Sequence, residues 1–175
     1  MRITGGRLGG RTLRSPPARS REVRPTSDRA RETLFAILGD VSDLSVLDLY
    51  CGTGALAIEA ISRGADSAVL VDRKTALAKR NVTEVGIANR CELIRSDALA
   101  YLGRTQERFG LILCDPPYTL ADPLDSKLVQ QLPARLAKYG RLAIESSARK
   151  PLEVDLPLLA ERRIGEALIR VYSER

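Results

Sequence analysis

The stretch Val46-Leu47-Asp48-Leu49-Tyr50-Cys51-Gly52-Thr53-Gly54 decides the fold, because an apolar run leads directly into a glycine-rich loop. A helical pattern follows from about Ala55 to Arg63, and with Ala57 the loop reads Gly-x-Gly-x-x-Ala. Glycines let the backbone turn sharply and let a ligand approach it closely. This strand–loop–helix unit is typical of an α/β protein, and it also fits a dinucleotide site.

The same alternation continues along the chain. Four more short apolar runs follow, at residues 68–71, 91–95, 111–114 and 142–144. Helical patterns lie between them, at residues 75–85, 97–102 and 127–137. Strands that alternate with helices indicate βαβ units and a parallel sheet covered on both faces. At the end, residues 158–164 and 167–172 flank Gly165 and predict two strands that add an antiparallel edge.

Positive charge is concentrated at the N-terminus. The 175 residues carry a net charge of +6, yet residues 1–31 hold nine arginines and two acidic residues, and the remainder has a balance of −1. An acidic partner is therefore expected for this end, with nucleic acid the first candidate. Residues 1–25 fit either a small β-hairpin or a disordered basic arm, and a helix is predicted from Thr26 or Ser27 to Gly39.

Composition excludes several chemistries. The chain has no histidine, which rules out Ser-His-Asp and Cys-His catalysis and a His-ligated metal site. Three widely spaced cysteines without a Cys-x-x-Cys pair predict neither a disulfide framework nor a zinc site, so no metal is expected. No apolar run is long enough to span a membrane, and the first residues do not form a signal peptide. A reducing cytoplasm is the simplest setting.

Two further acids follow strands. Asp72 ends the second apolar run and could accept both ribose hydroxyls of an adenosine, or it could cap the next helix. Asp97, in Ser96-Asp97-Ala98, follows the third run and could lie near an adenine amino group or act as an N-cap. The glycine loop and Asp72 suit an oxidoreductase and a methyltransferase equally. An acid at the position of Asp97 favours the methyltransferase.

Asp115-Pro116-Pro117-Tyr118 follows the fourth run and is the most informative motif. The two prolines stiffen the backbone and remove two N–H donors, which leaves the Asp115 carboxylate and the Pro116 carbonyl as acceptors. Such acceptors suit an exocyclic amino group on a base, and Tyr118 could stack on that base after it is flipped out.

Together these motifs resemble S-adenosylmethionine-dependent amino-group methyltransferases: residues 46–56 are similar to their motif I and residues 115–118 to motif IV. More narrowly, the chain resembles the RsmD family of small-subunit ribosomal RNA guanine-N2 methyltransferases. Residues 1–11, 24–32 and 58–65 carry that narrower match, which extends from Met1 to about Tyr172.

The resemblance implies a Rossmann-like class I methyltransferase domain at 26–175, with a seven-stranded, mostly parallel sheet, and a basic N-terminal β-hairpin extension at 1–25 that contacts RNA. It implies methyl transfer to N2 of one guanine in 16S rRNA, within the 30S subunit or a late precursor, by a cytoplasmic monomer. The implied cofactor-binding residues are Asp48, Tyr50, Cys51, Gly52, Gly54, Asp72, Arg73, Asp97 and Ala98. The implied catalytic residues are Asp115, Pro116 and Tyr118, and the substrate-binding residues are Arg7, Arg11, Arg24, Thr26, Arg29 and Pro117.

Three alternatives stay open on the sequence. Adenine N6 in DNA or RNA also offers an exocyclic amine, and Asp-Pro-Pro-Tyr alone does not separate it from guanine. A nicotinamide-dependent oxidoreductase would share the glycine loop and Asp72. A non-catalytic RNA-binding protein is disfavoured by motifs at all four pocket positions. Removing residues 1–22 is expected to leave cofactor binding intact and to abolish methylation.

Overall fold

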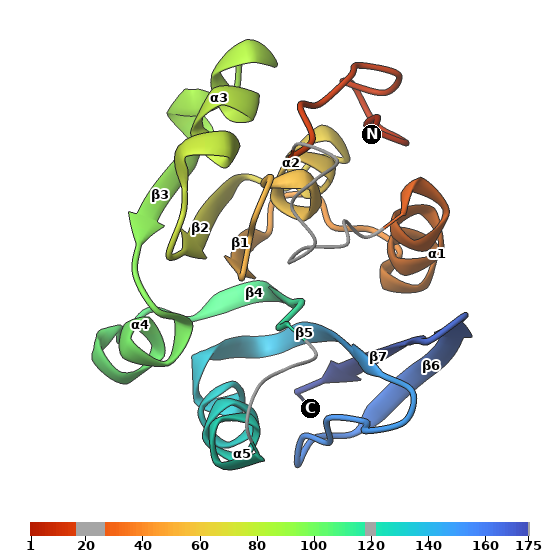
Figure 1. Ribbon diagram of the computed structural model, residues 1–175, viewed down its shortest axis with the longest axis vertical. Helices are drawn as coiled ribbons and strands as arrows, with labels where there is room; N and C mark the ends of the chain where they lie inside the picture. Colours follow the sequence, from red (N-terminus) through yellow and green to blue (C-terminus); the bar gives the residue numbers. More distant parts are fainter. Residues whose placement is uncertain (17–26, 118–121, 175) are drawn as a thin grey trace.

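The computed structural model describes residues 1–16, 27–117 and 122–174, and it contains one seven-stranded sheet in the order β3-β2-β1-β4-β5-β7-β6 (Figure 1). The strands are β1 Ser45–Leu49, β2 Ser67–Asp72, β3 Cys91–Arg95, β4 Phe109–Cys114, β5 Leu136–Ser147, β6 Leu158–Ile164 and β7 Ala167–Ser173. The first five strands pair in parallel, and β7 runs antiparallel between β5 and β6. The predicted parallel sheet with an antiparallel edge is therefore confirmed.

Helices cover both faces of this sheet (Figure 1). They are α1 Asp28–Leu38, α2 Ala55–Ser62, α3 Ala76–Glu84, α4 Ala98–Arg104 and α5 Asp122–Gln131, with short 3-10 turns at Ala88–Arg90 and Pro133–Arg135. The predicted first helix is confirmed, because the Ser27 side chain accepts a hydrogen bond from the Ala30 N–H and Gly39 ends the helix with φ 69°.

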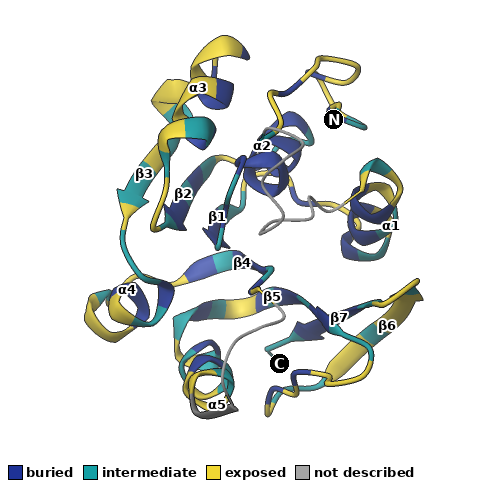
Figure 2. Ribbon diagram, in the orientation of Figure 1, coloured by how far each residue is buried: buried dark blue, intermediate teal, exposed yellow. Residues whose placement is uncertain are grey.

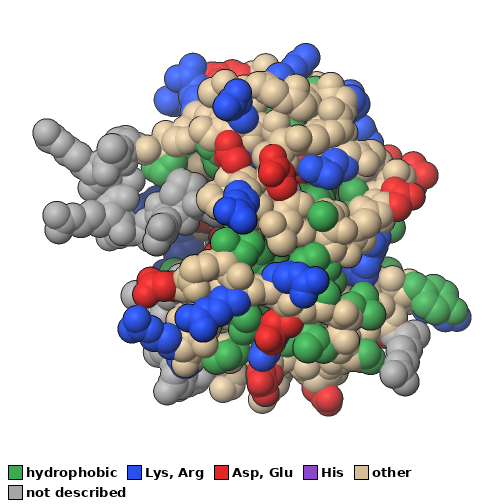
Figure 3. Space-filling model, turned by 90° about the vertical axis from the view of Figure 1, so that its right-hand side faces the viewer, with side chains coloured by type: hydrophobic (Ala, Val, Ile, Leu, Met, Phe, Trp, Pro, Cys, Tyr) green, Lys and Arg blue, Asp and Glu red, His purple; other side chains and the backbone are tan. Residues whose placement is uncertain are grey.

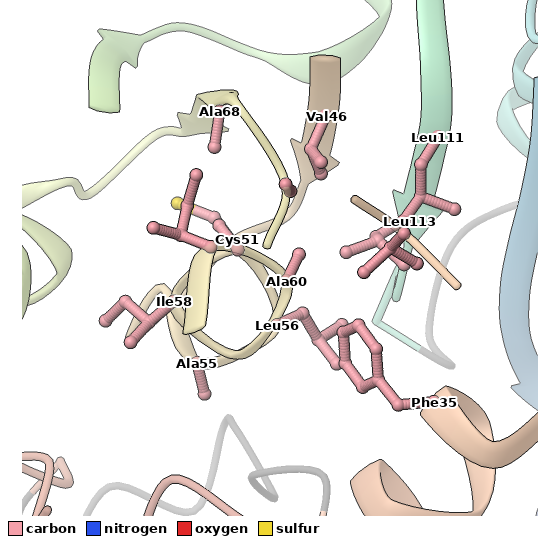
Figure 4. Close-up of a cluster of buried hydrophobic side chains, with 14 of the residues drawn as sticks. Phe35, Val46, Cys51, Ala55, Leu56, Ile58, Ala60, Ala68, Leu111 and Leu113 are labelled. Atoms are coloured by element: carbon pink, nitrogen blue, oxygen red, sulfur yellow. The ribbon is translucent and has the colours of Figure 1, made fainter. Parts of the chain in front are cut away.

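Two apolar clusters make the core, one on each face (Figure 2). The first joins α1, α2 and α3 to the sheet, and the second joins α4 and α5 to its other face. In the first cluster Phe35 of α1 points toward Leu56 of α2 (Figure 4). The helix that follows the glycine loop is thus fixed between the sheet and α1.

The N-terminal residues 1–16 contribute three buried side chains to the first cluster. Arg2 and Thr12 form an isolated antiparallel bridge, and the Ile3 N–H donates to the Arg11 carbonyl at 3.0 Å. Ile3, Leu8 and Leu13 have exposed fractions of 2–5% and pack with α1, α2 and α3. Deleting residues 1–22 would therefore open the core, so the expectation that cofactor binding survives this deletion is abandoned.

The predicted helix at 127–137 is wrong in its bounds. Helix α5 lies at Asp122–Gln131, and β5 already begins at Leu136. Leu132 still has helical backbone, with φ −60° and ψ −45°, but Pro133 has no N–H to continue the hydrogen bonds of the helix, so the helix ends earlier than the apolar spacing suggests. Strand β5 is also longer than the predicted 142–144, because Leu136 pairs with Phe109 before a register shift.

Candidate active site

The glycine loop lies between β1 and α2, and its two glycines serve different purposes. Gly52 and Gly54 have φ 52° and 75°, in the left-handed region that glycine adopts without strain. A Cβ on Gly54 would lie 3.0 Å from Leu70 Cδ2, whereas the nearest atom to one on Gly52 is the Tyr50 carbonyl oxygen at 3.9 Å. Gly54 therefore allows the loop to approach β2 and α3 closely, and Gly52 leaves open space beside the backbone.

Two carboxylates hold this loop from the ends of β1 and β2. Asp48 is 1% exposed, and its Oδ2 accepts a hydrogen bond from the Ala57 N–H at 3.1 Å. Burial raises the pKa of Asp48 to about 7, and the nearby charge of Asp72 adds to the rise. Asp72 Oδ2 accepts from the Gly52 N–H at 2.9 Å, which ties the end of β2 to the loop.

Asp97 takes the N-cap role that the sequence left as an alternative. Its Oδ1 accepts from the Leu99 and Ala100 N–H groups at 3.0 and 3.2 Å. Its Oδ2 lies 2.6 Å from Arg73 Nη2. Although burial acts to raise it, the pKa of Asp97 is lowered by hydrogen bonds from Arg73 and the helix backbone. The predicted contact of Asp97 and Ala98 with adenine stays a prediction.

The Asp-Pro-Pro motif lies beside the glycine loop because β1 and β4 are adjacent. Leu49 pairs with Cys114 in the parallel ladder, and the Asp115 N–H donates to the Leu49 carbonyl at 3.5 Å. Pro116 is buried and Pro117 is exposed, whereas Tyr118 lies outside the described residues. The sheet therefore brings Asp115 within one strand spacing of the glycine loop.

Asp115 lines a hollow at the carboxyl ends of β4 and β5. Its other walls come from α1, α2, β5 and β7, and its lining residues are Leu34, Leu56, Leu113, Cys114, Asp115, Ala143, Ile144, Glu145 and Ile169. A second hollow lies on the other side of the motif and includes Pro116, Pro117 and Lys150. Ligands of open α/β sheets bind at this carboxyl edge.

Tyr50, Cys51 and Cys114 lie at the same edge but offer no nucleophile. Burial raises the pKa of the Tyr50 hydroxyl and of both thiols, and neighbouring acidic groups add to the rise. A thiol must ionise to attack, so burial disfavours both cysteines as nucleophiles. Tyr50 has φ 61°, which shows that the chain turns sharply as it leaves β1.

The predicted RNA-binding residues are only partly described. Arg7, Arg11 and Arg29 are exposed, and Arg11 donates to the Val85 carbonyl at 3.1 Å. Arg24 and Thr26 lie outside the described residues. On the face drawn in Figure 3, Lys and Arg side chains are interspersed with Asp and Glu.

Sequence reasoning missed Asn81 and Glu145. Asn81 of α3 is 1% exposed, and its amide donates to the Thr53 carbonyl in the glycine loop at 2.9 Å. It also donates to the Arg14 carbonyl and accepts from the Arg14 N–H. No pattern marks such a residue inside a helix, whereas Glu145 directly follows the predicted strand at 142–144 and could have been found by its position.

The described residues contain no group of three His, Cys, Asp or Glu side chains that could hold a metal ion. Within the same ranges, none of the helices has the length and apolar character needed to cross a membrane.

The comparison with protein families decides the assignment. The family model described as "Conserved hypothetical protein 95" matches residues 1–173. The chain belongs to this family. Ribosomal RNA small subunit methyltransferase D of Escherichia coli K12 is 36% identical over 99% of this chain and 89% of its own length. The protein of the same name from Haemophilus influenzae is 30% identical over 99% of this chain and 93% of its own length.

Solved structures that are similar to this chain share its fold. A provisionally named methyltransferase from Escherichia coli has a TM-score of 0.84 at 29% identity and covers 100% of this chain and 98% of its own. A hypothetical protein from Thermus thermophilus has a TM-score of 0.82 at 27% identity, over 100% and 99%. The resemblance to the RsmD family, the class I methyltransferase fold and the expectation of an rRNA methyltransferase are thereby confirmed.

Proposed function

We propose that this chain transfers a methyl group from S-adenosylmethionine to the exocyclic N2 of one guanine in small-subunit ribosomal RNA. The observation that carries the proposal is the position of Asp115-Pro116 beside the glycine loop, one parallel strand away from Asp48. The relatives named as small-subunit rRNA methyltransferases support the substrate class.

The residues around the loop fit S-adenosylmethionine. The open space beside Gly52 would admit the methionine portion of the cofactor, and the Asp72 carboxylate would accept hydrogen bonds from the ribose hydroxyls. Buried Asp48 would face a positively charged ligand, which suits a carboxylate kept out of water. The cofactor supplies a methyl group that its sulfonium sulfur has already activated.

The chain's own residues would prepare the acceptor. Guanine N2 is a weak nucleophile because its lone pair is delocalised into the ring. Hydrogen bonds to the Asp115 carboxylate and the Pro116 carbonyl would orient this amino group and withdraw its lone pair from conjugation. As the nitrogen gains positive charge, the Asp115 carboxylate would stabilise it and then accept the proton.

The finer points of the proposal concern the setting of the reaction. The substrate is an assembled 30S particle or a late precursor, and the enzyme acts as a monomer in the cytoplasm. The exposed arginines at positions 7, 11 and 29 would contact RNA phosphates. The assembly stage of the substrate is tested by incubating particles isolated at successive stages with enzyme and labelled cofactor. The monomeric state is tested by sedimentation of the enzyme alone.

Two measurements test the proposed reaction. Methylated guanines are mapped in rRNA from cells with and without the gene, and an unchanged map would refute the proposal. In addition, Asp115→Ala is assayed separately for cofactor binding and methyl transfer. We expect normal binding and a rate lowered by at least about 100-fold. Asp66→Ala is the control, because that side chain is 72% exposed and lies 4.0 Å from Arg90.

A further inference from the structure

Two acidic residues follow paired positions of neighbouring strands at the carboxyl edge of the sheet. Cys114 of β4 pairs with Ile144 of β5 in the parallel ladder, and each is followed by an acid, Asp115 and Glu145. Both acids line the same hollow. The motif assigns Asp115 to the target amino group independently of Glu145, so on the proposed function Glu145 would lie beside the reacting base.

The walls of this hollow are apolar. Leu34 comes from α1 and Leu56 from α2, and both are at most 9% exposed. These apolar side chains lower the local dielectric constant beside the two acidic residues. Hydrogen bonds made there are stronger than in water, and an unmatched polar group is correspondingly costly.

The edge of guanine that carries N2 matches two neighbouring acceptors. Guanine presents the N2 amino hydrogens and the N1 hydrogen side by side, so it offers two donors. Adenine presents its N6 amino group beside a bare N1, which is an acceptor. An ionised carboxylate only accepts hydrogen bonds, so it pairs with guanine N1–H and repels adenine N1.

We propose that Glu145 selects guanine by accepting the N1 hydrogen of the base whose N2 amino group is held by Asp115. The inference rests on the proposed function and deepens it, because Asp-Pro-Pro-Tyr by itself fits either purine. Glu145 is held for this role by β5, where it pairs with Ile169 of β7 in the antiparallel ladder. A side chain on a central strand is positioned more rigidly than one on a loop.

The test uses a base that differs in the relevant hydrogen. The mapped target guanine is replaced by 2-aminopurine in rRNA assembled into the particle by ligation of a synthetic segment. This base keeps the 2-amino group but has no hydrogen on N1. Its missing O6 affects every enzyme variant alike, so the ratio of guanine to 2-aminopurine methylation reports on the contact to N1.

Wild-type enzyme should prefer guanine, and Glu145→Ala should lower guanine methylation by about 10- to 100-fold, the value of a hydrogen bond to a charged group. Methylation of 2-aminopurine should not fall, because its bare N1 gives Glu145 no hydrogen to accept, so the preference collapses. Glu145→Gln keeps an acceptor oxygen and adds a donor for N1, so its preference should fall at least about fivefold. Glu166→Gln is the matched control, since Glu166 is 70% exposed in the β6–β7 turn.

The outcomes separate the two proposals. Equal loss on both bases in Glu145→Ala, with cofactor binding retained, would mean a structural role and overturn the inference. If Glu145→Ala no longer binds the cofactor, Glu145→Gln decides, and a wild-type preference in that variant overturns the inference. If the rRNA map shows no guanine modified by this enzyme, the proposed function itself fails.

Discussion

Buried Asp48 makes cofactor affinity depend on pH. Its pKa of about 7, against an ordinary value of 3.8, follows chiefly from burial. At neutral pH the group is therefore divided between its neutral and ionised forms. If the cofactor brings positive charge next to Asp48, it binds the ionised form better and releases a proton on binding.

The direction and the size of the pH dependence of cofactor affinity follow from this linkage. Below pH 7 Asp48 is mostly protonated, so binding must first remove the proton, and affinity falls as pH falls. The limit is about tenfold per pH unit, which gives about 25-fold between pH 7.5 and 5.5. The cofactor's own α-amino group, with an ordinary pKa near 8, stays mostly protonated across this window. Above pH 7 the dependence on Asp48 levels off.

Isothermal titration calorimetry measures both consequences. Dissociation constants at pH 5.5, 6.5 and 7.5 give the slope, and two buffers with different ionisation enthalpies give the number of protons released. Asp48→Asn is the control, because its amide oxygen can still accept the hydrogen bond from Ala57. The variant should bind with no such slope. A flat wild-type profile, or the same slope in both proteins, would refute the reasoning.

Three further predictions concern stability and RNA binding. Glu59→Ala should cost about 2–4 kcal/mol in denaturant unfolding, because that side chain is fully buried and binds Thr4 and Arg63; exposed Glu84→Ala should cost less than about 1 kcal/mol. Gly54→Ala should destabilise the chain by about 1–3 kcal/mol and weaken cofactor binding, and it should cost more than Gly165→Ala, where positive φ is shared but no atom lies within 4 Å. Arg7→Ala should make the negative slope of log affinity for the rRNA particle against log salt concentration less steep by about 1. An unchanged slope would show that this residue does not contact RNA.

Elements fixed by local chemistry could be predicted from the sequence. Strand β3 has the predicted bounds Cys91–Arg95, and the two last strands flank Gly165, whose φ of 64° makes the tight turn. The end of α5 could not be predicted in this way, because its apolar spacing continues past the helix. There Pro133 and the pairing of Leu136 with Phe109 decide the backbone instead.

In the candidate site, too, local sequence predicts some residues and contacts between distant parts of the chain decide the others. Asp72 and Asp115 were found because each lies at the end of a strand, and the carboxyl ends of parallel strands meet at one edge. The partners of these groups depend on contacts between distant parts of the chain. The closeness of Asp115 and Glu145 follows from the register between β4 and β5, which the sequence alone does not specify.

The N-terminal segment also has a structural role that does not depend on its charge. Asn81 binds the backbone of Arg14 with both ends of its amide, and the same amide nitrogen donates to Thr53 in the glycine loop. One buried side chain thus joins the basic segment to the backbone that would hold the cofactor. Movement of the segment on an RNA surface would break these hydrogen bonds or shift the loop, and breaking them would leave polar groups unpaired in the interior.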